Sequence, residues 1–220
     1  RLTEQIHLRT FCLRECEAYV KAAGLALNRN QILQYYMIFG GVPYYWGFLK
    51  KGLSLSQNID SILFEKDAPL RDEFKYLYAS VFKKPENYVK IIEALGTKKV
   101  GMTREEIITA TKIPNSGDLT TKLEELESCG FIRKYNAFGM KKKNAIYQLM
   151  DCFTLFYFKF LKSEPTDEHF WTNQINTPAV NTWLGLAFER VCMEHVDQIK
   201  FKLGISGVLT EVNSWYCKSD

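Results

Sequence analysis

The sequence has no long apolar run, few histidines and no visible targeting peptide. No stretch of about 18 consecutive apolar residues occurs in its 220 residues, so no membrane-spanning helix is predicted. The first residues, Arg1-Leu2-Thr3, do not begin a charged and then apolar targeting peptide, and we therefore expect a cytoplasmic protein. Glycine and proline number 13 and 6, which excludes collagen-like and low-complexity classes.

Residues that could carry chemistry are also sparse. A zinc site needs clustered ligands, but the three histidines lie far apart and the six cysteines are scattered, so we expect reduced thiols and no bound metal. The sequence contains no phosphate-binding G-x-x-x-x-G-K-[ST] motif, no nucleophile elbow and no H-E-x-x-H motif. No catalytic residue is therefore predicted from the residues alone, and the chain by itself is expected to be inactive.

The net charge of the whole chain is +4, and the positive excess lies in its first two thirds. Residues 1–85 carry 12 Lys or Arg against 8 Asp or Glu, and residues 86–150 carry 11 against 8. Residues 151–220 carry 6 against 9. This distribution permits a nucleic-acid partner but does not require one.

Residues 1–85 are predicted to be helical. Apolar and helix-forming residues recur at helical spacing in four stretches, 13–24, 31–39, 54–64 and 69–82. Gly40-Gly41-Val42-Pro43 ends the second stretch, because glycine fits a left-handed cap and proline cannot continue the helical hydrogen-bond ladder. Lys83-Lys84-Pro85 is the clearest boundary in the chain.

Residues 86–150 have the pattern of a winged helix-turn-helix. After a first amphipathic helix, Thr103-Arg104-Glu105-Glu106 forms a capping box that opens a second helix. A third helix over 117–129, capped by Gly130, is expected to bury Leu119, Leu123, Leu126 and Cys129. Two β-type segments, 131–135 and 145–149, then flank a connector that contains Lys141, Lys142 and Lys143. Three helices followed by a β-hairpin predict this fold.

Residues 151–220 are predicted to begin a further domain. The aromatic stretch 151–162 is typical of a buried connecting helix, 163–178 of a polar linker, and about 181–203 of a helix. One β-type run, 208–216, follows. A lone strand cannot pair its backbone groups, so this domain is expected to be incomplete.

Two functions are open for the winged helix. In the first, helix 117–129 enters a major groove of double-stranded DNA with Thr120, Thr121 and Lys122 toward the bases or phosphates, while the connector lysines neutralise phosphates. In the second, the domain is a protein-docking scaffold, because three glutamates at 124, 125 and 127 disfavour approach to a polyanion. A stand-alone transcriptional regulator is a third interpretation.

Four motifs follow one another along the chain. They are Leu8-Arg9-Thr10-Phe11-Cys12-Leu13-Arg14-Glu15, then Gly40-Gly41-Val42-Pro43-Tyr44-Tyr45, then Ser116 to Lys134, then Ala187-Phe188-Glu189. Together they resemble the C-terminal part of prokaryotic AAA-type, STAND-like P-loop ATPases. The resemblance implies a mainly α chain with a helical lid at 1–85, a winged helix at 86–150 and the start of an incomplete α/β domain, similar to PD-(D/E)XK nucleases, at 151–220.

The resemblance also implies site residues and partners. ATP and Mg²⁺ would serve the full-length protein, held by a P-loop module before Arg1, and no cofactor is expected in this chain. Gly41 and Pro43 match the lid's Gly-x-Pro, which packs near the adenine, and Glu189 matches the helical glutamate of the nuclease fold. No metal site is expected, because the later nuclease acids are not in this chain. The implied function is an ATP-driven switch acting on or near DNA, its partner being the missing P-loop module, with an oligomer left open.

Overall fold

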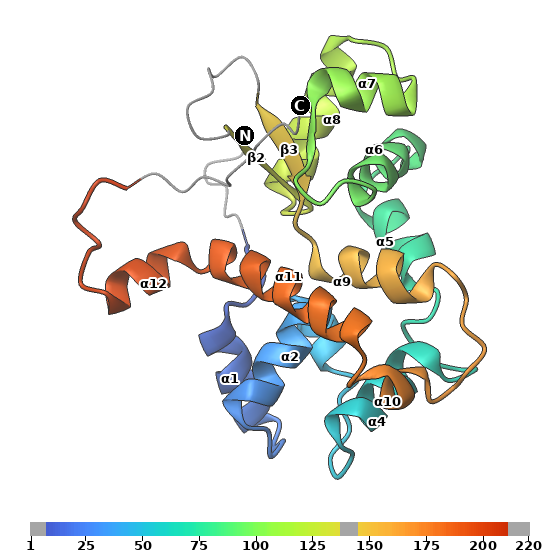
Figure 1. Cartoon of the computed structure of the whole chain (residues 1–220), viewed down its shortest axis with the longest axis vertical. Coiled ribbons are helices and arrows are strands. Elements are labelled where there is room, and N and C mark those ends of the chain that lie inside the picture. The colour runs from blue at the N-terminus through green and yellow to red at the C-terminus, as the bar shows by residue number, and fades with distance from the viewer. Residues whose placement is uncertain (1–7, 137–144, 211–220) are drawn as a thin grey trace, which may run out of the picture. The chain divides into compact units, whose positions relative to one another are not determined.

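The computed structural model describes residues 8–136 and 145–210. The described chain is mainly helical with one small antiparallel sheet, which confirms the mainly α prediction (Figure 1). It divides into two units that each join segments distant in sequence. The first unit combines the chain through Arg71 with Phe160–Val196, and the second combines Asp72–Lys159 with the chain from Asp197.

The first unit is built from helices. In chain order they are α1 (Leu13–Ala22), α2 (Arg29–Phe39), α3 (Pro43–Trp46), α4 (Leu55–Ile59), the π-helix η1 (Asp60–Phe64), α10 (Phe170–Gln174) and α11 (Pro178–Glu194). The central helix α2 packs against both α1 and α11 (Figure 1).

The ends of α2 follow from local sequence. Asn28 and Gln31 form a capping box, in which each side chain accepts a hydrogen bond from the other's backbone N–H at 2.9 Å. Gly40 adopts a φ of 59° after the last helical residue, which ends the helix where the sequence predicts. Between these ends, Tyr35 and Phe39 are fully buried and stack on each other.

The prediction of a polar linker over 163–178 is wrong for its second half. This stretch contains α10, whose Trp171 is only 1% exposed. The indole meets Phe160 and Trp183 edge-on, with ring centroids 5.2 and 6.3 Å away. A polar average over the stretch conceals a large apolar side chain, and burial of this indole helps to hold the short helix in the core.

The second unit combines helices with the sheet. Its elements are α5 (Glu73–Val81), α6 (Glu86–Gly96), β1 (Met102–Thr103), α7 (Arg104–Thr111), α8 (Gly117–Ser128), β2 (Ile132–Tyr135), β3 (Ile146–Leu149) and α9 (Cys152–Phe156). Two more helices, the π-helix η3 (Tyr157–Leu161) and α12 (Val196–Lys202), run from one unit into the other.

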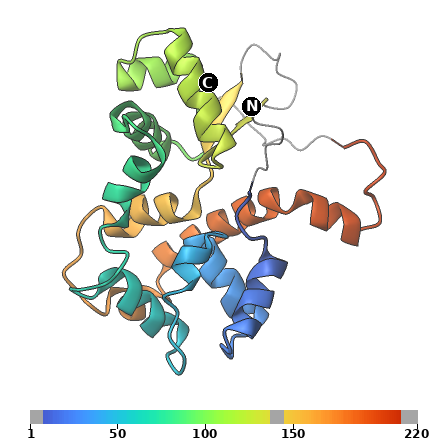
Figure 2. The same ribbon diagram turned by 180° about the vertical axis from the view of Figure 1, so that it is seen from behind.

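Strand β3 lies between β1 and β2 and is antiparallel to both. Ile132 pairs with Leu149 and Tyr135 with Ile146, so the pairing begins and ends on apolar residues. Helix α8 contacts β2 and runs beside the sheet (Figure 2). Its buried residues are Leu119, Leu123 and Leu126, as predicted.

One further core prediction for this helix is wrong. Cys129 is exposed, because α8 ends at Ser128 and Cys129 is its C-cap. The helical spacing that predicted burial therefore does not extend to this residue. Gly130 follows with a φ of 80°, as its capping role requires.

The aromatic stretch predicted as a buried connecting helix is α9 followed by η3, and Phe153, Phe156 and Phe160 in it are buried. The helix predicted over 181–203 is divided in two at His195, where α11 ends and α12 begins.

Candidate nucleic-acid interface and the Gly41 turn

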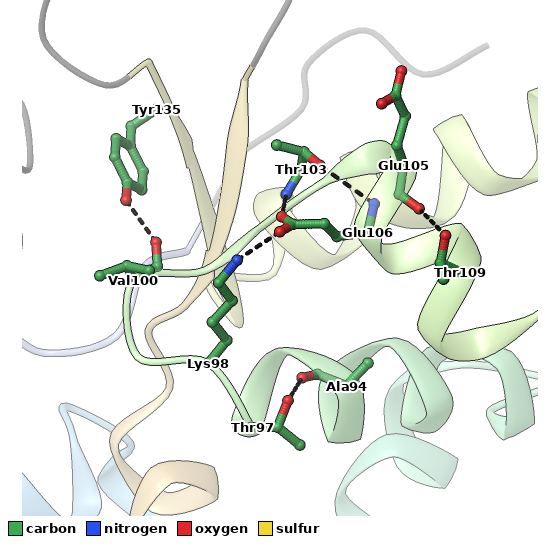
Figure 3. Close-up of polar contacts among 9 residues, drawn as sticks. All are labelled: Ala94, Thr97, Lys98, Val100, Thr103, Glu105, Glu106, Thr109 and Tyr135. Atoms are coloured by element: carbon green, nitrogen blue, oxygen red, sulfur yellow. Dashed lines mark hydrogen bonds and ion pairs between the residues drawn. The ribbon is translucent and has the colours of Figure 1, made fainter. Parts of the chain in front are cut away.

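The start of α7 is fixed by a network around Glu106. The Thr103 hydroxyl accepts a hydrogen bond from the Glu106 N–H, and the Glu106 carboxylate accepts one from the Thr103 N–H at 2.7 Å, so the predicted capping box is formed (Figure 3). Lys98 Nζ lies 2.6 Å from the same carboxylate. Partial burial acts to raise the pKa of Glu106, but the hydrogen bonds from Lys98 and Thr103 outweigh it and the pKa is lowered.

Glu106→Gln is expected to lower the free energy of unfolding by about 0.5 to 1 kcal/mol near neutral pH, because the amide loses the ion pair with Lys98. A carboxyl group whose pKa is lower in the folded state stabilises the fold above its unfolded pKa, and this contribution disappears as pH falls through the folded pKa. The difference between wild type and variant, measured by urea unfolding from pH 7 to pH 3, should therefore shrink toward pH 3. A difference that stays constant over this range would contradict the role given to the charge.

Thr120 and Thr121, predicted to face DNA, are both exposed on α8. Their hydroxyls donate to carbonyls of the preceding turn, Thr120 to Ser116 O at 3.5 Å and Thr121 to Gly117 O at 3.2 Å. Each hydroxyl oxygen keeps its lone pairs, so the two side chains can accept hydrogen bonds from a partner but already use their protons.

Lys122, the third predicted contact on α8, is held within the unit. Its Nζ lies 2.5 Å from Asp118 Oδ1 and 5.2 Å from the centroid of the Tyr88 ring, and its side chain is only 13% exposed. The Tyr88 hydroxyl in turn donates to Glu125. Burial, followed by this hydrogen bond, raises the pKa of Tyr88 to about 12. Lys122 therefore joins α8 to α6 and is a poor candidate for contact with a phosphate.

Carboxylates dominate the ionisable residues of α8. The helix carries Asp118, Glu124, Glu125 and Glu127 against the single Lys122. Glu127 accepts a hydrogen bond from the Lys134 N–H at 3.1 Å, and Glu124 is exposed. This surface repels nucleic-acid phosphates, so α8 is not electrostatically suited to lie in a major groove.

The connector between β2 and β3 contains the other predicted DNA contacts. Lys141, Lys142 and Lys143 lie outside the described residues. On the strands that precede and follow the connector in sequence, the Arg133 guanidinium lies 4.5 Å from the Tyr135 ring centroid and Lys134 Nζ lies 5.8 Å from that of Tyr147. Cations on aromatic faces keep their charge, so strand β2 itself carries positive charge.

Gly41 and Pro43, predicted to lie near a nucleotide, occupy the turn between α2 and α3. Gly41 is buried, and its carbonyl accepts a hydrogen bond from the Phe11 N–H at 2.8 Å. A Cβ atom added to Gly41 would lie 1.8 Å from the Phe11 carbonyl oxygen, so the close approach of these two backbones requires glycine. Pro43 is exposed and opens α3 as its first residue.

Glu189, the weak candidate for nuclease chemistry, is exposed on α11. Among residues 8–136 and 145–210, no three His, Cys, Asp or Glu side chains are arranged to hold a metal ion. Burial raises the pKa of Cys16 to about 12, which makes this thiol a poor nucleophile. The described part of the chain brings together no group of residues that would catalyse a reaction around Glu189.

Two buried polar residues that the sequence does not mark as site residues make long-range contacts in the first unit. The buried carboxylate of Asp60 accepts hydrogen bonds from α10, and the buried ring of His195 accepts one from the start of α1. Asp60 and Ser61 are both buried polar residues within the otherwise apolar stretch from Ile59 to Phe64, and a buried polar group requires a hydrogen-bond partner. His195 offers no comparable signal.

Comparison of the chain with known proteins identifies no relative. No family model matches the chain, and neither a curated protein nor a solved structure is significantly similar to it. Within the described residues, none of the helices combines the length and the apolarity needed to cross a membrane.

Proposed function

We propose that residues 86–150 are a winged-helix module of an ATP-driven switch protein, and that this module contacts the phosphates of double-stranded DNA without reading bases through α8. The observation that carries the proposal is the order helix, strand, helix, helix, strand, strand, with β3 between β1 and β2. This order is typical of winged helices, in which the connection between the last two strands is the wing.

Charge decides which part of the module meets DNA. Four carboxylates on α8 and the internal ion pair of Lys122 oppose a groove-reading helix. The consecutive lysines at 141, 142 and 143 fall in the connector that corresponds to the wing, and the strand before the connector contains Arg133 and Lys134. Phosphate contact by lysine is independent of sequence, so the binding should be weak and nearly equal for all duplexes.

The ATPase part of the proposal rests on the resemblance. The Gly41–Pro43 turn and the helical segment around it correspond to a lid, and the nucleotide, Mg²⁺ and the catalytic groups belong to an upstream P-loop module. In that arrangement the winged helix is the part that reports the nucleotide state to DNA.

The test is the salt dependence of DNA binding by the chain, followed by fluorescence anisotropy of a labelled duplex. Each neutralised phosphate contributes about −0.9 to the slope of log affinity against log salt, so three lysines should give a slope of roughly −2 to −3. Replacing Lys141, Lys142 and Lys143 together by alanine should remove most of this slope.

A matched control is K83A/K84A/K90A, which removes the same charge from exposed lysines of the same unit. It should leave the slope close to that of the wild type, and Lys122→Ala should do the same. If the two triple variants behave alike, the wing contact is wrong.

A second function is favoured by one specific observation. The carboxylate-rich surface of α8 is suited to a basic protein partner, so the module can instead be a protein-docking scaffold. Failure of the wild-type chain to bind any duplex at low salt would support this alternative.

A further inference from the structure

A set of hydrogen bonds in the first unit joins its earliest described segment to the end of α11. The N–H of Leu13, in the first turn of α1, donates to Nε2 of His195 at 3.0 Å across 182 residues of sequence. The amides of a first helical turn have no partner within the helix, so this imidazole supplies one from another element. The ring is 7% exposed, and water cannot readily replace it.

The hydrogen bond of the second ring nitrogen identifies the protonation state of the His195 ring. Nδ1 of His195 lies 2.8 Å from the Val191 carbonyl oxygen, one turn earlier in α11. A carbonyl oxygen only accepts, so Nδ1 carries a proton, whereas Nε2 must lack one in order to accept from Leu13. The geometry therefore fits only the neutral ring with its proton on Nδ1.

Neighbouring contacts extend this connection to the Gly41 turn. The Tyr36 ring meets the His195 ring edge-on at 5.3 Å, and the Tyr36 hydroxyl lies 3.0 Å from Phe11 O and 3.2 Å from Glu194 Oε2. Phe11 is hydrogen-bonded through its N–H to Gly41 O. The segment Phe11–Leu13 is thus held from two sides, by the Gly41 turn and by the end of α11.

We propose that His195 is a pH-sensitive latch, whose neutral ring holds the Leu13 amide at the start of α1 against the end of α11 and whose protonation breaks this contact. A proton added at Nε2 would point at the Leu13 N–H, so the hydrogen bond is lost and two donors oppose each other. Histidine is the side chain that ordinarily changes charge between about pH 5 and pH 8, so the latch is tested over this range. This inference is independent of the proposed function.

Other ionisable groups lie on the three elements that meet at this ring. At the start of α1 they are the N-cap Cys12 and then Arg14, Glu15 and Cys16; α2 contributes Tyr36, and the last turns of α11 contribute Arg190, Cys192 and Glu194. The carboxylates favour a cationic ring and the two arginines oppose one, but none of them removes the conflict between two donors at Nε2. Glu15 is already engaged, because it accepts a hydrogen bond from the Cys12 N–H at 2.7 Å.

The test uses NMR on the full wild-type chain. The imidazole ¹⁵N shifts of His195 at pH 8 should be those of a neutral ring protonated at Nδ1. The protection of the Leu13 amide against hydrogen exchange, corrected for intrinsic rates, should fall by about fivefold to tenfold between pH 8 and pH 5, which corresponds to loss of one hydrogen bond. The Gln31 amide, capped by the non-titrating Asn28 side chain in the same unit, should keep its protection.

Two variants make the assignment specific. His195→Gln should abolish the pH response of the Leu13 amide, whereas His169→Gln, which removes an exposed histidine of the same unit, should leave it intact. An Nε2-protonated or cationic ring at pH 8, equal Leu13 protection at both pH values, or a response that persists in His195→Gln would each overturn the latch. The wild-type measurement stands even if His195→Gln does not fold.

Discussion

Asp60→Ala is expected to destabilise the first unit by about 3 kcal/mol, since it removes a buried carboxylate that several donors share. Asp60 is 1% exposed and accepts from the Trp171 N–H at 2.7 Å, the Thr172 N–H at 3.1 Å and the Thr172 hydroxyl at 2.6 Å. Alanine would leave the buried Trp171 amide without this acceptor and would remove both contacts of Thr172. The loss should therefore appear as early unfolding of the segment that carries Trp171.

Urea unfolding followed by tryptophan fluorescence measures this effect, because the described tryptophans, at positions 46, 171 and 183, all lie in the first unit. Asp60→Asn keeps one acceptor oxygen and should lose about half as much. The exposed Asp67→Ala, a few residues further along the chain, should change stability by less than about 0.5 kcal/mol. An Asp60→Ala protein within 1 kcal/mol of the wild type would contradict the role of this carboxylate.

Gly41→Ala is expected to cost at least about 3 kcal/mol or to displace the segment around Phe11, because overpacking against backbone cannot be relieved by a rotamer change. The new Cβ would lie 1.8 Å from Phe11 O and 2.7 Å from both Phe11 C and Phe11 N. The same fluorescence-monitored unfolding measures the loss, and amide exchange of Leu13 would show whether the segment has moved.

Gly185→Ala is the matched control for this substitution. Gly185 lies inside α11 in the same unit, and a Cβ atom there would meet nothing within 4 Å. The Gly185→Ala substitution should stabilise the protein by roughly 0.5 to 1 kcal/mol, because alanine has the higher helix propensity. A Gly41→Ala protein as stable as Gly185→Ala would show that the turn tolerates a side chain. If the turn does not tolerate a side chain, packing alone explains why position 41 is glycine, and nucleotide binding is not needed as an explanation.

Local signals in the sequence predict the local structure. The Thr103–Glu106 capping box, the end of α2 at Gly40 and the three leucines of α8 each depend on residues within a few positions of one another, and each is found where expected. The prediction that Cys129 is buried is wrong, because α8 ends at Ser128 and the helical pattern does not continue to the next residue.

Contacts between distant parts of the chain could not be predicted in this way. Asp60 meets α10 from 111 residues away, and His195 meets Leu13 from 182 residues away. No periodicity links such partners, so neither a buried acid nor a tautomer-specific histidine could be assigned a function. Lys122 is different, because Asp118 lies four residues before it and the ion pair is an ordinary helix-surface contact that the spacing does predict.

Contact with DNA through α8 and contact through the connector lysines differ in whether the protein distinguishes one base sequence from another. If α8 lay in a major groove, Thr121 would contact particular base pairs, and Thr121→Ala would weaken binding to one sequence more than to others. With phosphate contact from the connector lysines, the same substitution should leave every affinity unchanged. The carboxylates of α8 favour the second outcome.

The most direct measurement of the central claim is therefore the affinity of the wild-type chain for several duplexes of equal length and unrelated sequence at low salt. Phosphate contact predicts measurable, weak binding with affinities within about threefold of one another, because phosphates carry no sequence information. A preference of more than about tenfold for one duplex would contradict contact without base reading. Absence of binding to all of them would contradict the DNA function itself and leave protein docking as the role of the module.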